Sequence, residues 1–349
     1  MSTILAIDEG HGYTKALTPR GQVLLLSLVG PAEAIRFESD VAETNGKGIA
    51  VEVDGRGYFV GEQAELQSAS ASQTLDAARI GSTEQKALFY AAASELVRTT
   101  DDALAVVTGL PVGDYDDRHK EALRAMLRGE HTVRRHGRRE RRFTVTDVYI
   151  LPQALGSLFA LVLDRTGRLV DGDLADGRVG VIDIGTLTTN YVLVDRLRYV
   201  EVGSDSITTG MSELLLKVAK DLKREHGLDW ALQLGQVDRA VRARQVAVYG
   251  DPVNIAGLVT PHLEALADTI VSRARTLWGA GVDLKAIVLT GGGSLELAPF
   301  LRQAYRHVRA VGGDPQFANA TGYLRAGLRR FGDGVQCPAA GKRALGGTH

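Results

Sequence analysis

Short apolar runs and longer stretches with helical spacing follow one another along this chain. Continuous apolar runs at residues 4–7, 103–107, 179–184 and 286–289 predict buried strands, and the segments 23–29, 143–150 and 191–194 predict further strands. Apolar positions three and four residues apart predict helices at 83–97, 210–226, about 261–278, 295–305 and 324–330. The order strand, glycine-rich turn, strand at the start of the chain returns about 175 positions later. The pattern therefore predicts two related units.

Two other segments have the pattern of hairpins. Residues 49–60 alternate around Asp54-Gly55, a strong signal for a type I′ turn. Residues 131–142 form a basic tract in which Gly137 separates two strand-like arms. Because no aromatic residue lies among these arginines to stack on bases, we interpret the tract as a solvated hairpin, with a filament or partner contact as the alternative. Beyond residue 330, a glycine-rich, polar sequence predicts a frayed tail.

Length and charge narrow the class of protein. The 349 residues exceed the roughly 250–300 beyond which a single core stops growing, so we expect two lobes. The chain has 41 basic and 42 acidic residues and a net charge of -1, so its overall charge does not attract it to nucleic acid or to a membrane surface. The single Cys337 excludes an internal disulfide and a cysteine zinc cluster. Since no signal peptide and no long apolar window is found, we expect a cytoplasmic protein without a membrane span.

The glycine clusters between strand-like runs carry the candidate chemistry. Residues 7–15 place Asp8 at the end of a strand, and two glycines in the turn let backbone N–H groups approach phosphate oxygens. Lys15 adds a positive charge. Residues 182–189 repeat the arrangement around Asp183, with hydroxyls in place of the second glycine and the lysine. Two strand-end carboxylates that face each other across a cleft predict a site for hydrated Mg²⁺.

A third glycine cluster, Gly291 to Gly293, follows a buried strand and leads into a helix. Such an entry lets backbone pass close to a nucleoside, although a simple connector has the same pattern. Each cluster alone is typical of an ordinary turn. The three clusters in this order favour a nucleotide site.

The three clusters also resemble a known superfamily. Asp-x-Gly-x-Gly-x-x-Lys from Asp8, Asp-x-Gly-Thr from Asp183 and Thr-Gly-Gly-Gly from Thr290 resemble the phosphate-1, phosphate-2 and adenosine segments of the actin, Hsp70 and sugar-kinase superfamily. Residues 58–64, 107–112 and 315–323 look like segments of the ParM/StbA plasmid-segregation actins and their archaeal relatives. The resemblance spans about residues 3 to 330.

The resemblance implies an α/β, actin-like (ribonuclease H-like) fold of two lobes with a nucleotide cleft between them. Domain I would comprise residues 1–153 and 316–349, with a small subdomain inserted around 30–65. Domain II would comprise residues 154–315. The ligands implied are ATP or ADP, with GTP possible, and Mg²⁺ held through water by Asp8 and Asp183.

The same resemblance assigns roles to single residues. Gln153 lies at the crossover between the lobes and matches the actin glutamine that orients the attacking water; the alternative is an inter-lobe hinge residue. With Asp8 and Asp183 it makes up the predicted catalytic set. Glu9 and His11 stand where the family commonly has small or hydroxyl residues, and residues 223–245 contain no clear base-contacting pair. The residues expected to contact the nucleotide are Gly10, His11, Gly12, Tyr13, Lys15, Gly185, Thr186, Gly210, Gly291, Gly292 and Gly293.

The function implied by the resemblance is that of a filament-forming ATPase. ATP would close the lobes, subunits would add head to tail, and hydrolysis would weaken the polymer. A ParM-like role in plasmid segregation would involve a DNA-binding adaptor protein rather than direct contact with nucleic acid. The alternatives are a small-molecule kinase of the same superfamily, which needs a carboxylate base where this chain has Gln153, and a scaffold that binds ATP without polymerising.

Overall fold

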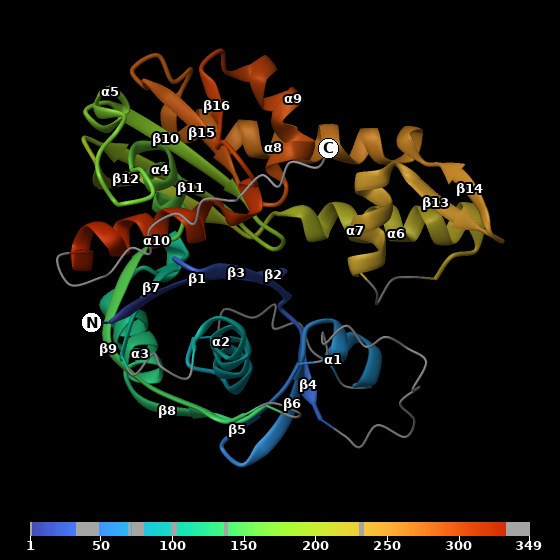
Figure 1. Ribbon diagram of the computed structural model, residues 1–349. Helices are drawn as coiled ribbons and strands as arrows, with labels where there is room; N and C mark the ends of the chain where they lie inside the picture. The colour runs from blue at the N-terminus through green and yellow to red at the C-terminus, as the bar shows by residue number, and fades with distance from the viewer. Residues whose placement is uncertain are drawn as a thin grey trace, which may run out of the picture.

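Two β-sheets of matching design form the two lobes of the protein (Figure 1). The computed structural model describes residues 2–32, 49–68, 71, 80–98, 103–135, 139–229 and 234–332. The strands of the first sheet are β1 (Thr3–Glu9), β2 (Tyr13–Thr18), β3 (Gly21–Leu26), β7 (Ala103–Leu110), β8 (Gly129–Val133) and β9 (Arg141–Pro152). Those of the second sheet are β10 (Arg178–Ile184), β11 (Thr189–Asp195), β12 (Arg198–Ile207), β15 (Ala286–Thr290) and β16 (Val308–Ala310).

The two sheets share one topology at their centres. The first has the order β3-β2-β1-β7-β9-β8 and the second the order β12-β11-β10-β15-β16. In each sheet, the three strands that are consecutive in the chain pair antiparallel. The first of them in the chain, β1 or β10, also begins a parallel row, which is β1, β7 and β9 in the first sheet and β10, β15 and β16 in the second. The predicted repeat is therefore confirmed. The mixed α/β architecture, with one sheet in each lobe, is the expected actin-like fold.

One strand of the first sheet was not predicted. The sequence predicts a second strand at 23–29, directly after a glycine-rich turn, whereas the structure places β2 at Tyr13–Thr18 and only then β3. The first four side chains of β2 alternate between half-buried and buried positions, as expected of a strand with one face toward a core, and the last two are buried as well. The glycine motif that indicated a turn, residues 7–15, overlaps the first residues of β2. The alternating pattern of the strand was therefore read as part of the turn.

The first lobe also contains a small sheet and a central helix. The strands β4 (Val29–Pro31), β6 (Arg56–Val60) and β5 (Ile49–Val53) lie side by side in that order. The predicted hairpin at 49–60 is confirmed, and Asp54 and Gly55 both have positive φ, 50° and 78°, as a type I′ turn requires. The lobe's helices are α1 (Glu62–Gln67), α2 (Thr83–Leu96) and α3 (Asp117–Leu127), with a 3₁₀ turn η2 (Val112–Asp114).

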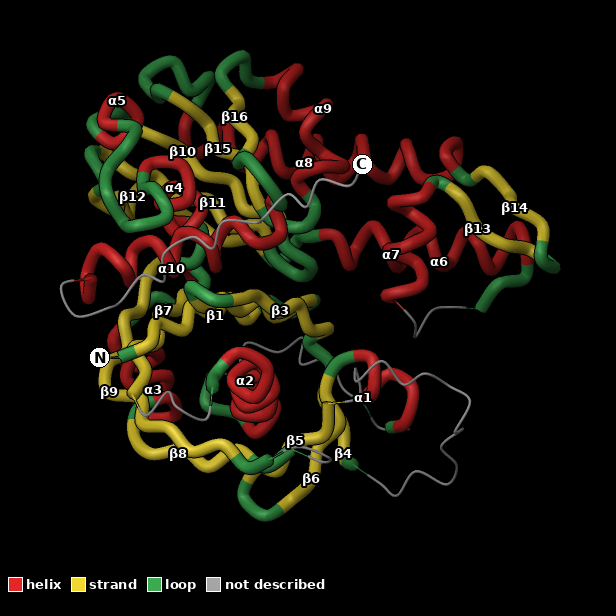
Figure 2. Tube along the Cα trace, in the orientation of Figure 1, coloured by secondary structure: helices red, strands yellow, loops and turns green. Residues whose placement is uncertain are grey.

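Helix α2 lies inside a ring of strands. Figure 2 shows it nearly end-on, with strands of both sheets of the first lobe around it. The sequence predicts one apolar stripe on this helix, but Leu88, Phe89, Ala92 and Ala93 are buried as well. A helix that is apolar on nearly every side is buried on nearly every side. The ring closes where Val51 of β5 pairs with Arg135, just beyond β8.

The basic tract helps to close this ring. Arg135 is 6% exposed and pairs with Glu95 at the end of α2. Arg134 bonds to Glu52 of β5 and to Glu140, each at 2.9 Å. The interpretation as a hairpin is confirmed by the pairing of β8 with β9. Its description as solvated is wrong for Arg135 and for His131, because both are buried. Gly137 and the tail from residue 333 lie outside the described residues.

The second lobe buries its apolar side chains around four helices and a hairpin. The helices are α6 (Met211–His226), α7 (Leu234–Ala243), α8 (Ala256–Trp278) and α9 (Ser294–Ala304), and the hairpin is β13 (Gln245–Val248) with β14 (Asp251–Asn254). A short helix α5 (Gly172–Ala175) precedes β10. The helix predicted from about 261 begins earlier, at Ala256, so Pro261 lies inside it. None of the helices in the described ranges is long and apolar enough to cross a bilayer.

Two helices cross between the sheets. They are α4 (Leu155–Val162) and α10 (Ala318–Phe331), which follows a 3₁₀ turn η3 (Pro315–Phe317). Figure 1 shows α10 running between the two lobes. The sequence predicts only the second half of this helix, at 324–330. A Cβ atom added at Gly322 would lie 1.6 Å from the carbonyl oxygen of Gly156, so the two helices meet backbone against backbone.

This crossing generates a prediction on stability. Gly322→Ala should lower the free energy of unfolding by about 1–3 kcal/mol or more, because neither backbone can move aside as a side chain would. Gly257→Ala in α8 is the matched control, since no atom lies within 4 Å of a Cβ added there, and it should gain up to about 1 kcal/mol. Urea unfolding measures both. Equal stabilities for the two variants would contradict the close crossing.

A second prediction concerns His131. Its Nε2 lies 2.7 Å from the carbonyl oxygen of Leu127, which can only accept, so Nε2 carries the proton and Nδ1 accepts from the Tyr90 hydroxyl at 3.3 Å. Burial lowers the pKa of His131 below its usual 6.5. Below about pH 6.5 the unfolded chain therefore binds a proton that the folded chain refuses, and the free energy of unfolding should fall as the pH is lowered. Urea unfolding at about pH 7.5 and 5.5 should show a smaller pH dependence for His131→Gln than for the wild type.

Candidate functional site

The ends of the parallel strands carry the polar side chains of the site. Asp8 lies near the end of β1 and Asp183 near the end of β10, and both are 4% exposed. Gln153 directly follows β9, and Thr290 ends β15. Because parallel strands end at the same edge of a sheet, these groups gather at one edge of each lobe. Three of them, Asp8, Gln153 and Asp183, line a shared cavity.

Asp8 is held by two donors. Lys15 stands opposite it on β2 and places Nζ 3.3 Å from Asp8 Oδ2. The amide Nε2 of Gln153 donates to Asp8 Oδ1 at 2.9 Å. The backbone of Gln153 is fixed in turn, because its N–H donates to Leu110 and its carbonyl accepts from the Tyr323 hydroxyl at 2.7 Å. The orientation of the Asp8 carboxylate is therefore set by a donor on the neighbouring strand β2 and by a donor at the end of β9, two strands away on the other side.

Asp183 has one donor of its own. Asn319 Nδ2 donates to Asp183 Oδ2 at 2.8 Å. Burial, followed by the charge of Asp8, raises the pKa of Asp183 to about 6, although Asn319 and Lys15 oppose the shift. Asn190 stands opposite Asp183 on β11, as Lys15 stands opposite Asp8. Within the described chain, the buried Asn190 Oδ1 accepts no hydrogen bond, and Asn190 lines the cavity.

The two glycine loops touch each other across the site. A Cβ atom added at Gly12 would lie 2.0 Å from Thr186 Oγ1 and 2.9 Å from Thr186 Cβ, so only glycine fits there. The second loop is fixed from behind by α6, whose first N–H groups, those of Met211 and Ser212, donate to the carbonyls of Gly185 and Thr186. Gly210 is the residue that precedes α6, and its Cα packs against the same two carbonyls. The backbone at Gly12 thus packs directly against the Thr186 side chain, and the two loops are in contact.

Gly291 and Gly293 close the site from the side of the second lobe. Gly291 has a φ of 87°, and a Cβ atom there would lie 2.4 Å from Asp183 Oδ1. Both its backbone angle and this contact require glycine. The N–H of Gly293 donates to the carbonyl of Ile184 at 3.0 Å, which ties the start of α9 to the end of β10.

Two adjoining cavities make up the site. The first, of about 530 Å³ including its opening to solvent, lies between the carboxylates and the two loops. The second, of about 460 Å³ measured in the same way, extends from the loops to α6 and α7. They share six lining residues: Gly12, Tyr13, Gly185, Thr186, Gly292 and Gln316. A single elongated ligand with a polar end among the loops fits this shape.

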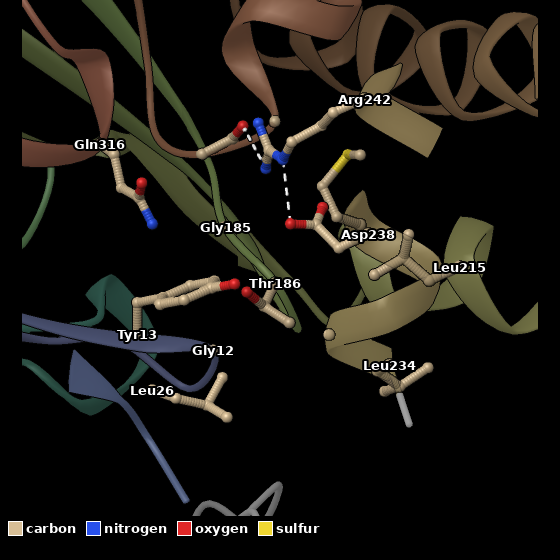
Figure 3. Close-up of a pocket in the computed structure, with 14 residues that line it drawn as sticks. Gly12, Tyr13, Leu26, Gly185, Thr186, Leu215, Leu234, Asp238, Arg242 and Gln316 are labelled. Atoms are coloured by element: carbon tan, nitrogen blue, oxygen red, sulfur yellow. Dashed lines mark hydrogen bonds and ion pairs between the residues drawn. The ribbon is translucent and has the colours of Figure 1, made fainter. Parts of the chain in front are cut away.

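The second cavity has aromatic, apolar and charged walls. Figure 3 shows Tyr13 on one side and Arg242 with Asp238 on the other. Arg242 bonds through Nε to Asp238 at 2.9 Å and through a terminal nitrogen to the carbonyl of Gly292 at 3.2 Å. Burial, followed by the charge of Asp238, raises the pKa of Tyr13, so its hydroxyl stays protonated. Planar groups of this kind suit a nucleobase or ribose.

Nearly all residues that the sequence singled out line these cavities. The exception is Gly210, which supports the second loop from behind. Sequence reasoning missed Asn190, Asp238, Arg242 and Gln316 as lining residues. Asn190 had a usable signal, because it follows Asp183 by the same seven positions that separate Lys15 from Asp8, and Gln316 lies in the segment 315–323 that resembles the ParM-like actins. Asp238 and Arg242 have the spacing of any surface ion pair on a helix.

The oxygen atoms of the site suit a Mg²⁺ ion that keeps its water molecules. The charge of Asp8 raises the proton affinity of the buried Asp183, and a cation between the two carboxylates removes that cost. Both oxygens of Asp8 already accept from donors, so contact through water suits it better than direct ligation. The unpaired Asn190 Oδ1 adds an acceptor for a bound water. A direct cage is absent: the described residues contain no group of three His, Cys, Asp or Glu side chains placed to hold a metal.

Two families of known proteins match the chain. Residues 6–156 match the family described as the N-terminal domain of actin-like proteins. Residues 181–303 match the C-terminal domain of the MreB-like archaeal actin homologues. The chain belongs to the actin-like proteins. This actin-like protein is also 28% identical to an archaeal actin homologue of Thermoplasma volcanium over 344 residues, which covers 93% of the chain and 99% of that relative.

Solved structures share the fold of this actin-like protein. The crystal structure of the archaeal actin homologue Ta0583 matches with a TM-score of 0.79 at 21% identity, covering 94% of this chain and 99% of that one. A 15-stranded ParM filament from Clostridium botulinum matches with a TM-score of 0.78 at 23% identity, covering 96% and 99%. Ta0583 in complex with ADP matches with a TM-score of 0.75 at 22% identity, covering 94% and 99%.

The contact between the loops generates a prediction. Gly12→Ala should weaken nucleotide binding by about 1–3 kcal/mol, because rotation of the Thr186 side chain cannot relieve a contact that includes Thr186 Cβ. Gly113→Ala is the control, since a Cβ atom there has no neighbour within 4 Å. Calorimetric titration with ADP measures both variants. Wild-type affinity in Gly12→Ala would mean that the loops do not need this approach.

Proposed function

We propose that this actin-like protein is a nucleotide-dependent, filament-forming ATPase of the ParM-like type. The observation that carries the proposal is the continuous cavity between two matching sheets, with a buried carboxylate at each sheet edge and two glycine loops in contact between them. An ADP complex of a relative with the same fold supports a nucleotide as the ligand. ATP and Mg²⁺ are the proposed pair, with GTP as the alternative nucleotide.

Each group of residues has a task in this proposal. The N–H groups of Gly10 and Gly185 close their own loops by donating to the carbonyls of Tyr13 and Thr188. The other backbone N–H groups of these two loops bind phosphate oxygens, and Lys15 neutralises part of the phosphate charge. Asp8 and Asp183 hold Mg²⁺ through its waters, and this ion supplies charge neutralisation of the phosphates when bound. The wall formed by Tyr13 and Arg242 takes the nucleoside.

Gln153 is the proposed water-positioning residue. Its Nε2 must face Asp8, because a carboxylate only accepts, and its Oε1 is therefore the atom left for a water molecule. An amide is too weak a base to remove a proton, but it can orient the attacking water. The proposed reaction is ATP hydrolysis to ADP and phosphate.

Assembly is proposed from the relatives. ParM forms filaments in one structure of this fold, and a non-polymerisable ParM variant has the same fold. A head-to-tail contact between copies of this chain would generate an open filament. Segregation of DNA through an adaptor protein is the proposed cellular role, without direct nucleic-acid contact by the basic tract, whose Arg134 and Arg135 are already paired with carboxylates.

Electron microscopy and light scattering test the proposal. The purified chain with ATP and Mg²⁺ should scatter more light above a critical concentration and should show filaments, and EDTA should prevent both. Nucleotide turnover without assembly at any concentration would favour a small-molecule kinase. Binding without turnover or assembly would favour a scaffold.

Gln153→Ala separates binding from hydrolysis. Loss of one oriented polar group costs on the order of 10²- to 10³-fold in rate, so phosphate release should slow by about that factor. The variant should still pellet with ATP, and its filaments should persist. Gln22→Ala, at an exposed position on β3, is the matched control with unchanged phosphate release. A Gln153 variant with wild-type turnover, or one that no longer pellets, would make Gln153 a hinge residue instead.

A further inference from the structure

Asn319 joins three elements at the buried edge of the site. It is 4% exposed and lies in the first turn of α10. Its Oδ1 accepts from the backbone N–H of Ser157 at 3.1 Å and from the Ser157 hydroxyl at 2.7 Å. Its Nδ2 donates to Asp183 Oδ2 at 2.8 Å. One side chain therefore links α10, α4 and β10.

The direction of this amide follows from the chemistry of its neighbours. A backbone N–H can only donate, so the atom that faces Ser157 N must be the carbonyl oxygen of Asn319. The NH₂ group is consequently turned toward Asp183. The Ser157 hydroxyl is itself fully buried and lies 2.8 Å from the Thr290 hydroxyl. Thr290 therefore holds the Ser157 hydroxyl in place against the carbonyl oxygen of Asn319.

The link crosses from one lobe to the other. Helix α10 packs on β1, β2 and β7 of the first sheet, whereas Asp183 belongs to the second sheet. The other oxygen of Asp183, Oδ1, lies against the backbone of Gly291 at the cavity wall. The rotation of the Asp183 carboxylate is thus limited on both sides, by Asn319 at Oδ2 and by Gly291 at Oδ1.

We propose that Asn319 is a positioning residue that holds the Asp183 carboxylate in the orientation needed to bind a hydrated divalent cation beside a nucleotide phosphate. This inference rests on the proposed function, since it names the support of the same site. Asn319 also lines the cavity, but its Oδ1 accepts both bonds from Ser157, and its NH₂ group, which cannot bind a cation, is turned toward Asp183. Without this donor, the Asp183 carboxylate would keep its charge but would rotate more freely. Binding of a cation would then have to order the carboxylate, and this cost would lower the affinity.

The Mg²⁺ dependence of nucleotide binding separates this role from simple packing. The full-length chain is titrated calorimetrically with AMPPNP in EDTA and in Mg²⁺, and the ratio of the two affinities is the gain from Mg²⁺. Asn319→Leu should reduce this gain about tenfold or more, because it removes a hydrogen bond to a charged group, and should change the affinity in EDTA by less than about twofold. Ser157→Ala should reduce the gain less, since it frees only one of the bonds at Oδ1.

Arg325→Leu is the matched control for these variants. Like Asn319, Arg325 joins α10 to α4, because its guanidinium donates to the carbonyls of Ala160 and Leu163, and neither of these partners belongs to the site. The variant therefore removes a link between the same two helices. It should keep the wild-type gain from Mg²⁺. A reduction equal to that of Asn319→Leu would assign the effect to packing of α10 and overturn the inference.

The remaining outcomes are distinct. If the wild type gains affinity from Mg²⁺ and Asn319→Leu gains as much, the positioning role is overturned and the proposed function stands. If the wild type binds AMPPNP equally with and without Mg²⁺, the proposed cation site is overturned and this inference with it. If circular dichroism shows that Asn319→Leu does not fold, Ser157→Ala decides: a wild-type gain in that variant overturns the inference.

Discussion

The electrostatic repulsion between two buried carboxylates is the constraint on which the rest of the site depends. Asp8 and Asp183 come from different sheets and are both almost excluded from solvent, and the charge of Asp8 raises the cost of ionising Asp183. Every polar side chain that reaches them in the described chain, namely Lys15, Gln153 and Asn319, is a donor. The lobes can therefore approach at this edge only because donors come from β2, from the end of β9 and from α10.

Sequence reasoning found those parts of the site that are local in the chain. A strand end, a carboxylate and a glycine turn lie within about ten residues, so the loops at Asp8, Asp183 and Gly291 could be predicted from their spacing. Asn319 and Arg242 could not be assigned in that way. They reach the cavity from helices whose own patterns are ordinary, and only the crossing of α10 with α4 and the packing of α7 place them there.

The fold was predicted with similar limits. The repeat of two strand–turn–strand units was evident because continuous apolar strands mark both sheet centres. Strand β2 was missed because its alternation is short and begins inside the glycine motif. The burial of Arg135 was missed because a run of arginines is typical of a solvated surface, whereas here one of them reaches Glu95 through the ring of strands around α2. Long-range pairing of charges leaves no mark in local sequence.

The attachment of the second loop to α6 also decides how that loop meets a phosphate. In a planar trans peptide the C=O and N–H groups point in opposite directions. The carbonyls of Gly185 and Thr186 point at α6, so the N–H groups of Thr186 and Leu187, which belong to the same two peptide units, point away from the helix. These two peptide dipoles are therefore aligned with the dipole of α6. The loop offers an anion two N–H groups and a partial positive charge, as the N-terminus of α6 itself would, although the helix does not reach the anion directly.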